Sequence, residues 1–168
     1  KKIRFDEVIE LSGLGFRYND TKNWILKKVA LRIRKGEKVG FIGSTGSGKS
    51  TLINIIMGLL DPTEGSISVD RVPLSNQNIL DWRKKVAHVP QDIFLADSSV
   101  KENIALGVPL EEIDYDELVS AAKQAKIHDF IEARPNGYNE VVGENGIKLS
   151  GGQKQRIGIA RALFKKAD

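Results

Sequence analysis

Residues 43–50 carry the clearest chemistry in the sequence, because they spell G-x-x-x-x-G-K-S, the pattern of a phosphate-binding loop. Glycines such as Gly46 and Gly48 lack a Cβ, so the backbone can curl around a ligand and point successive N–H groups at an anion. Lys49 supplies a full charge for the β- and γ-phosphates of a nucleotide, and the Ser50 hydroxyl can hold Mg²⁺. The residues predicted to bind nucleotide here are Gly43, Ser44, Thr45, Gly46, Ser47, Gly48, Lys49, Ser50 and Thr51.

A second candidate anion site lies at Ser150-Gly151-Gly152-Gln153, where a helix is predicted to begin and to run to about residue 164. Ser150 is a favourable N-cap, and the glycines expose N–H groups in the first turn, where the helix dipole is positive. An ordinary capped helix would explain the serine. Two glycines, however, are a poor choice for helix stability alone, which favours a ligand that approaches this backbone closely.

The elements around the phosphate loop match the context that such a motif requires. Residues 38–42 are short and mostly apolar and predict a buried strand, and an apolar helix follows Lys49 and ends near residues 58–60, before Asp61-Pro62. Strand, glycine-rich turn and helix are the setting of a phosphate-binding loop. Further strands are predicted over residues 7–18, 25–33, 65–70 and 86–89, with a short helix over 79–83.

The second half of the sequence has a helical character. Helices are predicted over residues 98–105, 116–125 and 127–133, and a loop over 134–146 precedes the last helix. In the second of these helices, Leu118, Ala121, Ala122 and Ala125 fall on one face. An α/β first half with a phosphate loop is therefore followed by a helical part.

Composition excludes several classes of function. The 168 residues are enough for one ordinary domain. The net charge is only +4, from 26 Lys+Arg against 22 Asp+Glu, and the charged residues are scattered along the sequence, which favours a solvated surface over a nucleic-acid face. The chain has no Cys and only two His, so a disulfide or a thiolate or histidine metal cluster is not expected. No apolar run reaches the ~18 residues of a membrane span. The chain as given is expected to be soluble, with a cytoplasmic composition.

Taken together, the motifs resemble those of the ATP-binding (nucleotide-binding) domain of ABC transporters, over the whole length of the chain. GSTGSGKS resembles Walker A, and LSGGQ followed by Lys154-Gln155-Arg156 resembles the family signature. Gln91, which follows Pro90, resembles the Q-loop glutamine. Tyr18 stands where the family stacks an aromatic ring on adenine, a contact commonly worth ~1–3 kcal/mol.

The resemblance implies an α/β fold, namely a P-loop NTPase core with an N-terminal antiparallel β part and an α-helical signature subdomain. The β part and core are expected over about residues 1–90 and the helical subdomain over about 91–160. ATP and Mg²⁺ are the implied cofactors. Gln91 would touch Mg²⁺ or the attacking water, in support of catalysis, and would lie near a membrane domain.

The implied partners are a second ABC ATP-binding domain and a transmembrane domain fused N-terminally. In the family, two nucleotide domains meet head to tail, so Ser150, Gly151, Gly152 and Gln153 would act on the ATP that is bound by the partner. This arrangement implies a place at the cytoplasmic face of a membrane, and no nucleic-acid partner.

Two segments resemble those of exporter-type domains. Residues 142–146 (VGENG) resemble the loop that touches the membrane helices, and residues 94–104 also have an exporter pattern. The nearest likeness is to the branch that flips lipids or lipid-linked saccharides. The implied function is ATP hydrolysis that powers export or flipping of such a substrate across a membrane.

The family's Walker B strand, its catalytic Glu, the D-loop and the switch histidine would all follow Asp168, so no catalytic base is assigned and the core is expected to be incomplete. The 168 residues alone are therefore expected to be poorly stable, to bind ATP weakly and to hydrolyse it negligibly. Two alternatives stay open: a non-catalytic nucleotide-binding fragment, and a soluble ABC ATPase without a transport role. Two departures concern Asp70-Arg71, where the family usually has Asp-Gly, and Gly158, whose place inside a helix suggests close packing.

Overall fold

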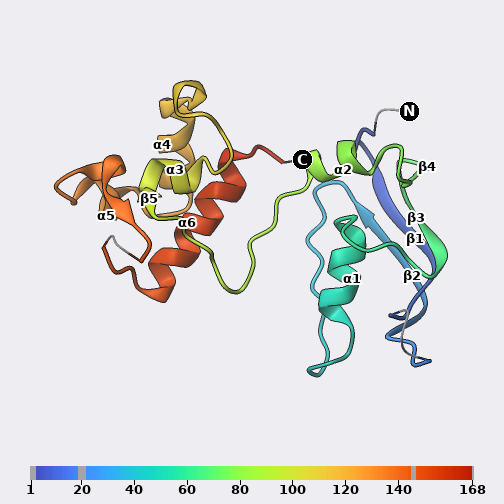
Figure 1. Cartoon of the computed structure of the whole chain (residues 1–168). Coiled ribbons are helices and arrows are strands. Elements are labelled where there is room, and N and C mark those ends of the chain that lie inside the picture. Colours follow the sequence, from blue (N-terminus) through green and yellow to red (C-terminus); the bar gives the residue numbers. More distant parts are fainter. Residues whose placement is uncertain (1–2, 19–21, 145–146, 168) are drawn as a thin grey trace. The chain divides into compact units, whose positions relative to one another are not determined.

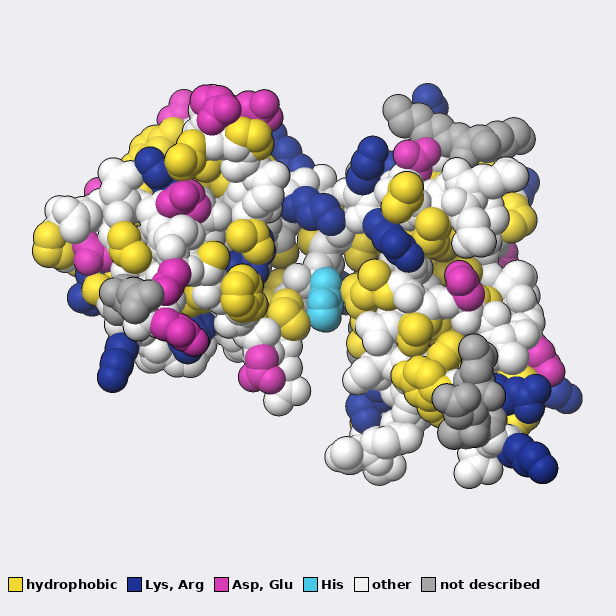
Figure 2. Space-filling model, viewed as in Figure 1, with side chains coloured by type: hydrophobic (Ala, Val, Ile, Leu, Met, Phe, Trp, Pro, Cys, Tyr) yellow, Lys and Arg dark blue, Asp and Glu magenta, His cyan; other side chains and the backbone are white. Residues whose placement is uncertain are grey.

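The structure is a computed structural model that describes residues 3–18, 22–144 and 147–167. The chain divides into two compact units, the first ending at Val86 and the second comprising Ala87–Ala167. On the face shown in Figure 2, basic, acidic and hydrophobic side chains intermingle over each unit. No helix within the described ranges is long and apolar enough to cross a membrane.

An antiparallel sheet of four strands, in the order β2-β1-β3-β4, forms the frame of the first unit (Figure 1). In the central strand, Leu11 lies opposite Leu31 on one side and Ile67 on the other. This arrangement confirms the predicted N-terminal antiparallel part. The strands are β1 (Val8–Phe16), β2 (Leu26–Arg34), β3 (Glu64–Val69) and β4 (Val72–Pro73).

Two helices pack on this sheet, α1 (Lys49–Ile56) and α2 (Ile79–Lys85). Ile55 of α1 and Trp82 of α2 are buried in one cluster with Leu11 and Ile67 of the sheet. Both helices were predicted from the sequence, and Figure 1 shows α1 running alongside the strands. The phosphate-loop helix is therefore fixed by apolar contacts with strands that lie on both sides of it in the sequence.

The predicted strands over residues 38–42 and 86–89 are wrong, because both segments are irregular. Val39 is 39% exposed and Ile42 is 99% exposed, so residues 38–42 are not buried either. A strand of a parallel sheet needs neighbours that satisfy its backbone groups and cover its two faces. No other described segment pairs with residues 38–42.

The turn between β3 and β4 is built by Asp70 and Arg71, which both have positive φ angles, 47° and 64°. A two-residue turn with positive φ angles at both positions matches the right-handed twist of the two strands that it joins. The Asp70 carboxylate accepts hydrogen bonds from the backbone N–H groups of Glu7 at 2.9 Å and Val8 at 2.7 Å, and also from Asp6. Burial acts to raise the pKa of Asp70, but these donors and nearby Lys35 outweigh it, so the pKa lies below its ordinary value.

Arg71→Gly is expected to raise the free energy of unfolding by about 1 kcal/mol, because a side chain at this positive φ angle is strained and glycine is not. Chemical denaturation of the chain measures the change. Arg71→Ala is the matched control, since it removes the arginine but keeps the strain, and it should give no gain. A gain of the same size from alanine would show that the backbone angle is not the cause.

The second unit is helical and contains α3 (Val100–Ile104), α4 (Tyr115–Gln124), α5 (His128–Glu132) and α6 (Gly151–Phe164). Its core is one cluster that includes Ile104, Leu118, Ile127 and Ile157. The predicted apolar face of α4 is confirmed, because Leu118, Ala121, Ala122 and Ala125 are all buried. The fold class, an α/β part with an antiparallel sheet and a helical part, is thus confirmed.

Short elements in this unit depart from the expectation. The predicted loop over 134–146 contains η2 (Gly137–Asn139) and β6 (Val141–Val142), and η1 (Leu110–Glu112) precedes α4. Strand β6 pairs with β5 (Ser98–Ser99), so the helix predicted from residue 98 begins only at Val100. Two-residue strands carry no periodicity that a sequence pattern could reveal.

Gly158 confirms the predicted close packing inside α6. A Cβ at this position would lie 3.0 Å from Cγ1 of Ile93 and closer still to its Cδ1. Ile93 belongs to the irregular segment that follows Gln91. The glycine therefore allows this segment to lie directly on the helix.

Candidate nucleotide-binding site

The phosphate loop ends at the first residue of α1, as its pattern predicts. Gly48 is the N-cap residue, with a φ of 89°, which a residue with a side chain rarely adopts. A Cβ on Gly48 would also lie 2.9 Å from Cδ2 of Leu26 and 3.2 Å from the carbonyl oxygen of Ile25. Glycine is therefore required here both by the backbone angle and by the contact with β2.

Lys49 folds back over the loop that precedes it. Its Nζ donates hydrogen bonds to the carbonyl oxygens of Gly43 at 2.7 Å and Ser44 at 2.8 Å, and to Oγ of Ser47 at 3.3 Å. The ammonium is thus held above the turn by neutral acceptors. An ionised phosphate oxygen is a stronger acceptor for the same group.

An open pocket of about 270 Å³ lies beside this loop. None of the described residues that line it is acidic, so its lining suits an anion. Backbone N–H groups at the start of a helix, an ammonium group and hydroxyls are the donor set that binds phosphate. Ser50, the predicted Mg²⁺ ligand, is among the lining residues, which are Ile25, Gly46, Ser47, Gly48, Lys49, Ser50 and Thr51.

Tyr18 lies just after the end of β1 and is half-exposed. Its ring is 49% exposed and meets the ring of Phe16 edge-on, with centroids 5.0 Å apart. The carbonyl oxygen of Phe16 accepts a hydrogen bond from the N–H of Ile25, which lines the phosphate pocket. Tyr18 is thus linked to the pocket only through Phe16 and Ile25, and its stacking on a base stays a prediction.

The second candidate anion site lies at the start of α6, which has a capping box. The N–H of Gln153 donates to Oγ of Ser150 at 3.3 Å, and the N–H of Ser150 donates to Oε1 of Gln153 at 2.8 Å. Ser150 is therefore the predicted N-cap. Gln153, predicted as a nucleotide contact, has a capping role that the sequence reasoning did not anticipate.

Gly151 and Gly152 have no steric reason to be glycine within this chain. Both are exposed, and a Cβ built on either one would have no other described atom within 4 Å. Neither has a positive φ angle. Since glycine weakens a helix relative to alanine, the open backbone at this helix start is left without an explanation from the described fold.

Gln91 is exposed in the irregular segment of the second unit. Sequence reasoning missed the two residues that organise this segment. Arg161 of α6 donates to the carbonyl oxygens of Phe94 at 2.9 Å and of Asn103 at 2.8 Å, and burial lowers its pKa. Asn103 is fully buried and bonds the backbone of Ala96 through both ends of its amide.

A pocket of about 380 Å³ lies between this segment and the residues that precede α6. Its lining combines apolar side chains such as Leu95 with the charged residues Glu144 and Lys154. The predicted membrane-contact loop over 142–146 reaches this pocket through Gly143 and Glu144, and Asn145 and Gly146 lie outside the described residues. The predicted functional residues thus fall into two groups, one on each unit.

Comparison with known proteins adds independent support. The chain is 41% identical over 164 residues to the ATP-dependent lipid A-core flippase of Chromohalobacter salexigens. The aligned region covers 98% of this chain and 28% of the relative. It is 43% identical over 168 residues to the ATP-dependent lipid A-core flippase of Cupriavidus metallidurans, covering 99% of this chain and 28% of that protein. The chain therefore spans little more than a quarter of the length of these relatives.

A solved structure agrees with these matches. The structure of a bacterial Atm1-family ABC exporter with ATP bound is 34% identical in sequence, with a TM-score of 0.88, and covers 98% of this chain and 28% of that chain. The protein family described as ABC transporter matches this chain over residues 26–168, which include both the phosphate loop and the start of α6. The chain belongs to the ABC transporter family.

Proposed function

We propose that this chain is the ATP-binding part of a membrane exporter, and that the protein containing it hydrolyses ATP to move a substrate across a membrane. The observation that carries the proposal is the phosphate loop at the start of α1, with the Lys49 ammonium held over its turn. A non-acidic pocket lined by helix-start N–H groups supports an anionic ligand.

Within this site each residue has a distinct task. The N–H groups of residues 46–51 and the Lys49 ammonium bind the β- and γ-phosphates, and the Ser50 hydroxyl holds Mg²⁺. Mg²⁺ held there would supply positive charge to the phosphates. Tyr18 stacks on the adenine ring, which its half-exposed side chain permits.

The start of α6 completes the site of a second ABC domain. Gly151 and Gly152 present an open backbone for which this chain supplies no steric reason. A γ-phosphate bound by a partner domain would approach these N–H groups at the positive end of the helix. Two such domains, arranged head to tail, bury two ATP molecules, and Gln91 contacts Mg²⁺ or the attacking water.

The transmembrane partner belongs to the remaining length of the protein. Relatives of which this chain covers 28% are named lipid A-core flippases, which supports a fused membrane domain and a place at the cytoplasmic face of a membrane. The pocket that contains Leu95, Glu144 and Lys154 is the surface proposed to meet it. A lipid or lipid-linked saccharide is the proposed substrate class.

The test uses the full-length protein that contains this chain, reconstituted in lipid vesicles. Fluorescent-nucleotide titration, Mg²⁺-dependent phosphate release and movement of a labelled lipid A analogue between leaflets are expected to occur together. Nucleotide binding without phosphate release would support the non-catalytic alternative. ATP hydrolysis by a protein that is recovered in the soluble fraction, separate from membranes, would support the soluble alternative. A failure to bind nucleotide would reject the proposal.

A further inference from the structure

The C-terminal end of the phosphate-loop helix is held by side chains of α2. Nε1 of Trp82 donates to the carbonyl oxygen of Ile56, the last residue of α1, at 2.7 Å. Nε and Nη2 of Arg83 both donate to the carbonyl oxygen of Gly58, at 2.9 and 2.6 Å. Two consecutive residues of α2 therefore bind the end of α1 and the turn that follows it.

These contacts suit the end of a helix. The last carbonyl groups of a helix have no partner within it, and the negative end of the helix dipole favours a cation such as Arg83. The turn is also shaped for them, because Gly58 has a φ of 71° and a Cβ there would lie 3.0 Å from Cγ1 of Ile79 and 3.4 Å from Cδ1 of Trp82. Glycine lets α2 come this close.

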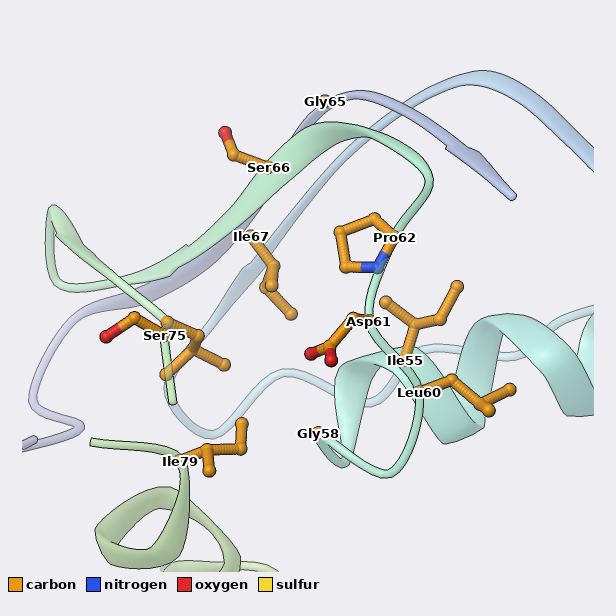
Figure 3. Close-up of a pocket in the computed structure, with 11 residues that line it drawn as sticks. Ile55, Gly58, Leu60, Asp61, Pro62, Gly65, Ser66, Ile67, Ser75 and Ile79 are labelled. Atoms are coloured by element: carbon orange, nitrogen blue, oxygen red, sulfur yellow. The ribbon is translucent and has the colours of Figure 1, made fainter. Parts of the chain in front are cut away.

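A small open pocket with a mixed polar and apolar lining, which includes Asp61 and Ser75, lies beside the same end of α1. Figure 3 shows Ile55, Leu60 and Ile79 around a cavity of about 100 Å³ that also borders Ile67 of β3. Next to this pocket, the hydrogen bonds of Trp82 and Arg83 bind the carbonyl groups at the helix end.

Trp82 is itself firmly placed. It is only 3% exposed, and its ring meets that of Phe5 edge-on, with centroids 6.1 Å apart. Phe5 is fastened in turn, since its carbonyl oxygen accepts a hydrogen bond from Nζ of Lys35 at 2.7 Å. The donor on α2 is thus backed by the segment that leads into β1.

We infer that Trp82 and Arg83 are positioning residues for the phosphate loop, an inference that rests on the proposed function. Helix α1 has only eight residues, about two turns, so a displacement of one end is expected to move the other. The missing Cβ of Gly48 lets one end lie close to β2, and Trp82 and Arg83 hold the other end by hydrogen bonds. Loss of the second attachment lets the helix tilt and turns its N–H groups and Lys49 away from the phosphates.

The test compares Arg83→Gln with Arg83→Lys in the full-length protein, with Lys84→Gln as the matched control. Lys84 is an exposed neighbour on the same helix, so its replacement makes the same change of charge. Arg83→Gln is expected to raise the Kd and KM for MgATP roughly fivefold, the low end of coupling between separate sites, and to leave kcat nearly unchanged. Arg83→Lys should restore most of the affinity, because it keeps a cationic donor near the carbonyl, and Lys84→Gln should have no effect.

A merely structural role would lower the melting temperature but leave the Kd of the folded protein unchanged, and that result would overturn the inference. If Arg83→Gln does not fold, Trp82→Phe is the second variant, since it keeps a ring and loses the N–H donor. A Kd about threefold higher is expected for it, the low range for one lost hydrogen bond, and an unchanged Kd would again overturn the inference. Lys49→Ala in the same assay separates the two ideas: normal binding by this variant would reject the proposed function itself.

Discussion

Lys49→Ala is expected to weaken MgATP binding about ten- to a hundredfold and to abolish ATP hydrolysis by the full-length protein. The substitution removes the only cationic side chain that lines the described pocket. With it goes a charged hydrogen bond to phosphate worth about 1.5–3 kcal/mol, and also the positive electrostatic potential at the site. Titration with a fluorescent ATP analogue and phosphate release measure the two effects.

The same substitution should leave stability almost unchanged. Lys49 bonds the carbonyl oxygens of Gly43 and Ser44, and both residues are exposed, so water replaces the lost donor. Lys38→Ala is the matched control, because Lys38 is also exposed in the first unit but does not line the pocket. Equal rates for the Lys49 variant and the unaltered protein would remove Lys49 from the site.

Gly152→Asp is expected to reduce ATP hydrolysis by about a hundredfold while leaving the folded state as stable as before. A carboxylate in the first turn is favourable for a helix, and a side chain at this position meets no other described atom within 4 Å. Opposite the γ-phosphate of a partner domain, however, the like charges repel by several kcal/mol. The melting temperature and the ATP affinity should therefore stay almost unchanged, while the rate of phosphate release falls strongly.

Gly158→Ala on the same helix provides the contrasting control. A Cβ there would press on Ile93, so this variant should lose about 1–3 kcal/mol of stability. If Gly152→Asp instead lowered stability, or weakened ATP binding to a single domain, the start of α6 would act within its own chain and the two-domain site would be wrong.

The sequence by itself determined the features that depend on local chemistry. The glycines before Lys49, the Ser150 cap of α6 and the apolar face of α4 all lie where the pattern predicted them. Each is governed by residues within a few positions of one another, because positive φ angles, capping and helical periodicity are local properties. The motif resemblance added the family, which the comparison with known proteins confirmed.

Only the tertiary structure decided the features that depend on distant neighbours. Residues 38–42 have the composition of a buried strand, yet they are irregular, because a strand exists only where another segment pairs with it. The two-residue pairing of β5 with β6, the Asn103–Arg161 network and the hold of Trp82 and Arg83 on α1 left no pattern in the sequence. These contacts join positions far apart in the chain, and a single sequence records the residue types of each partner but not which partner it meets.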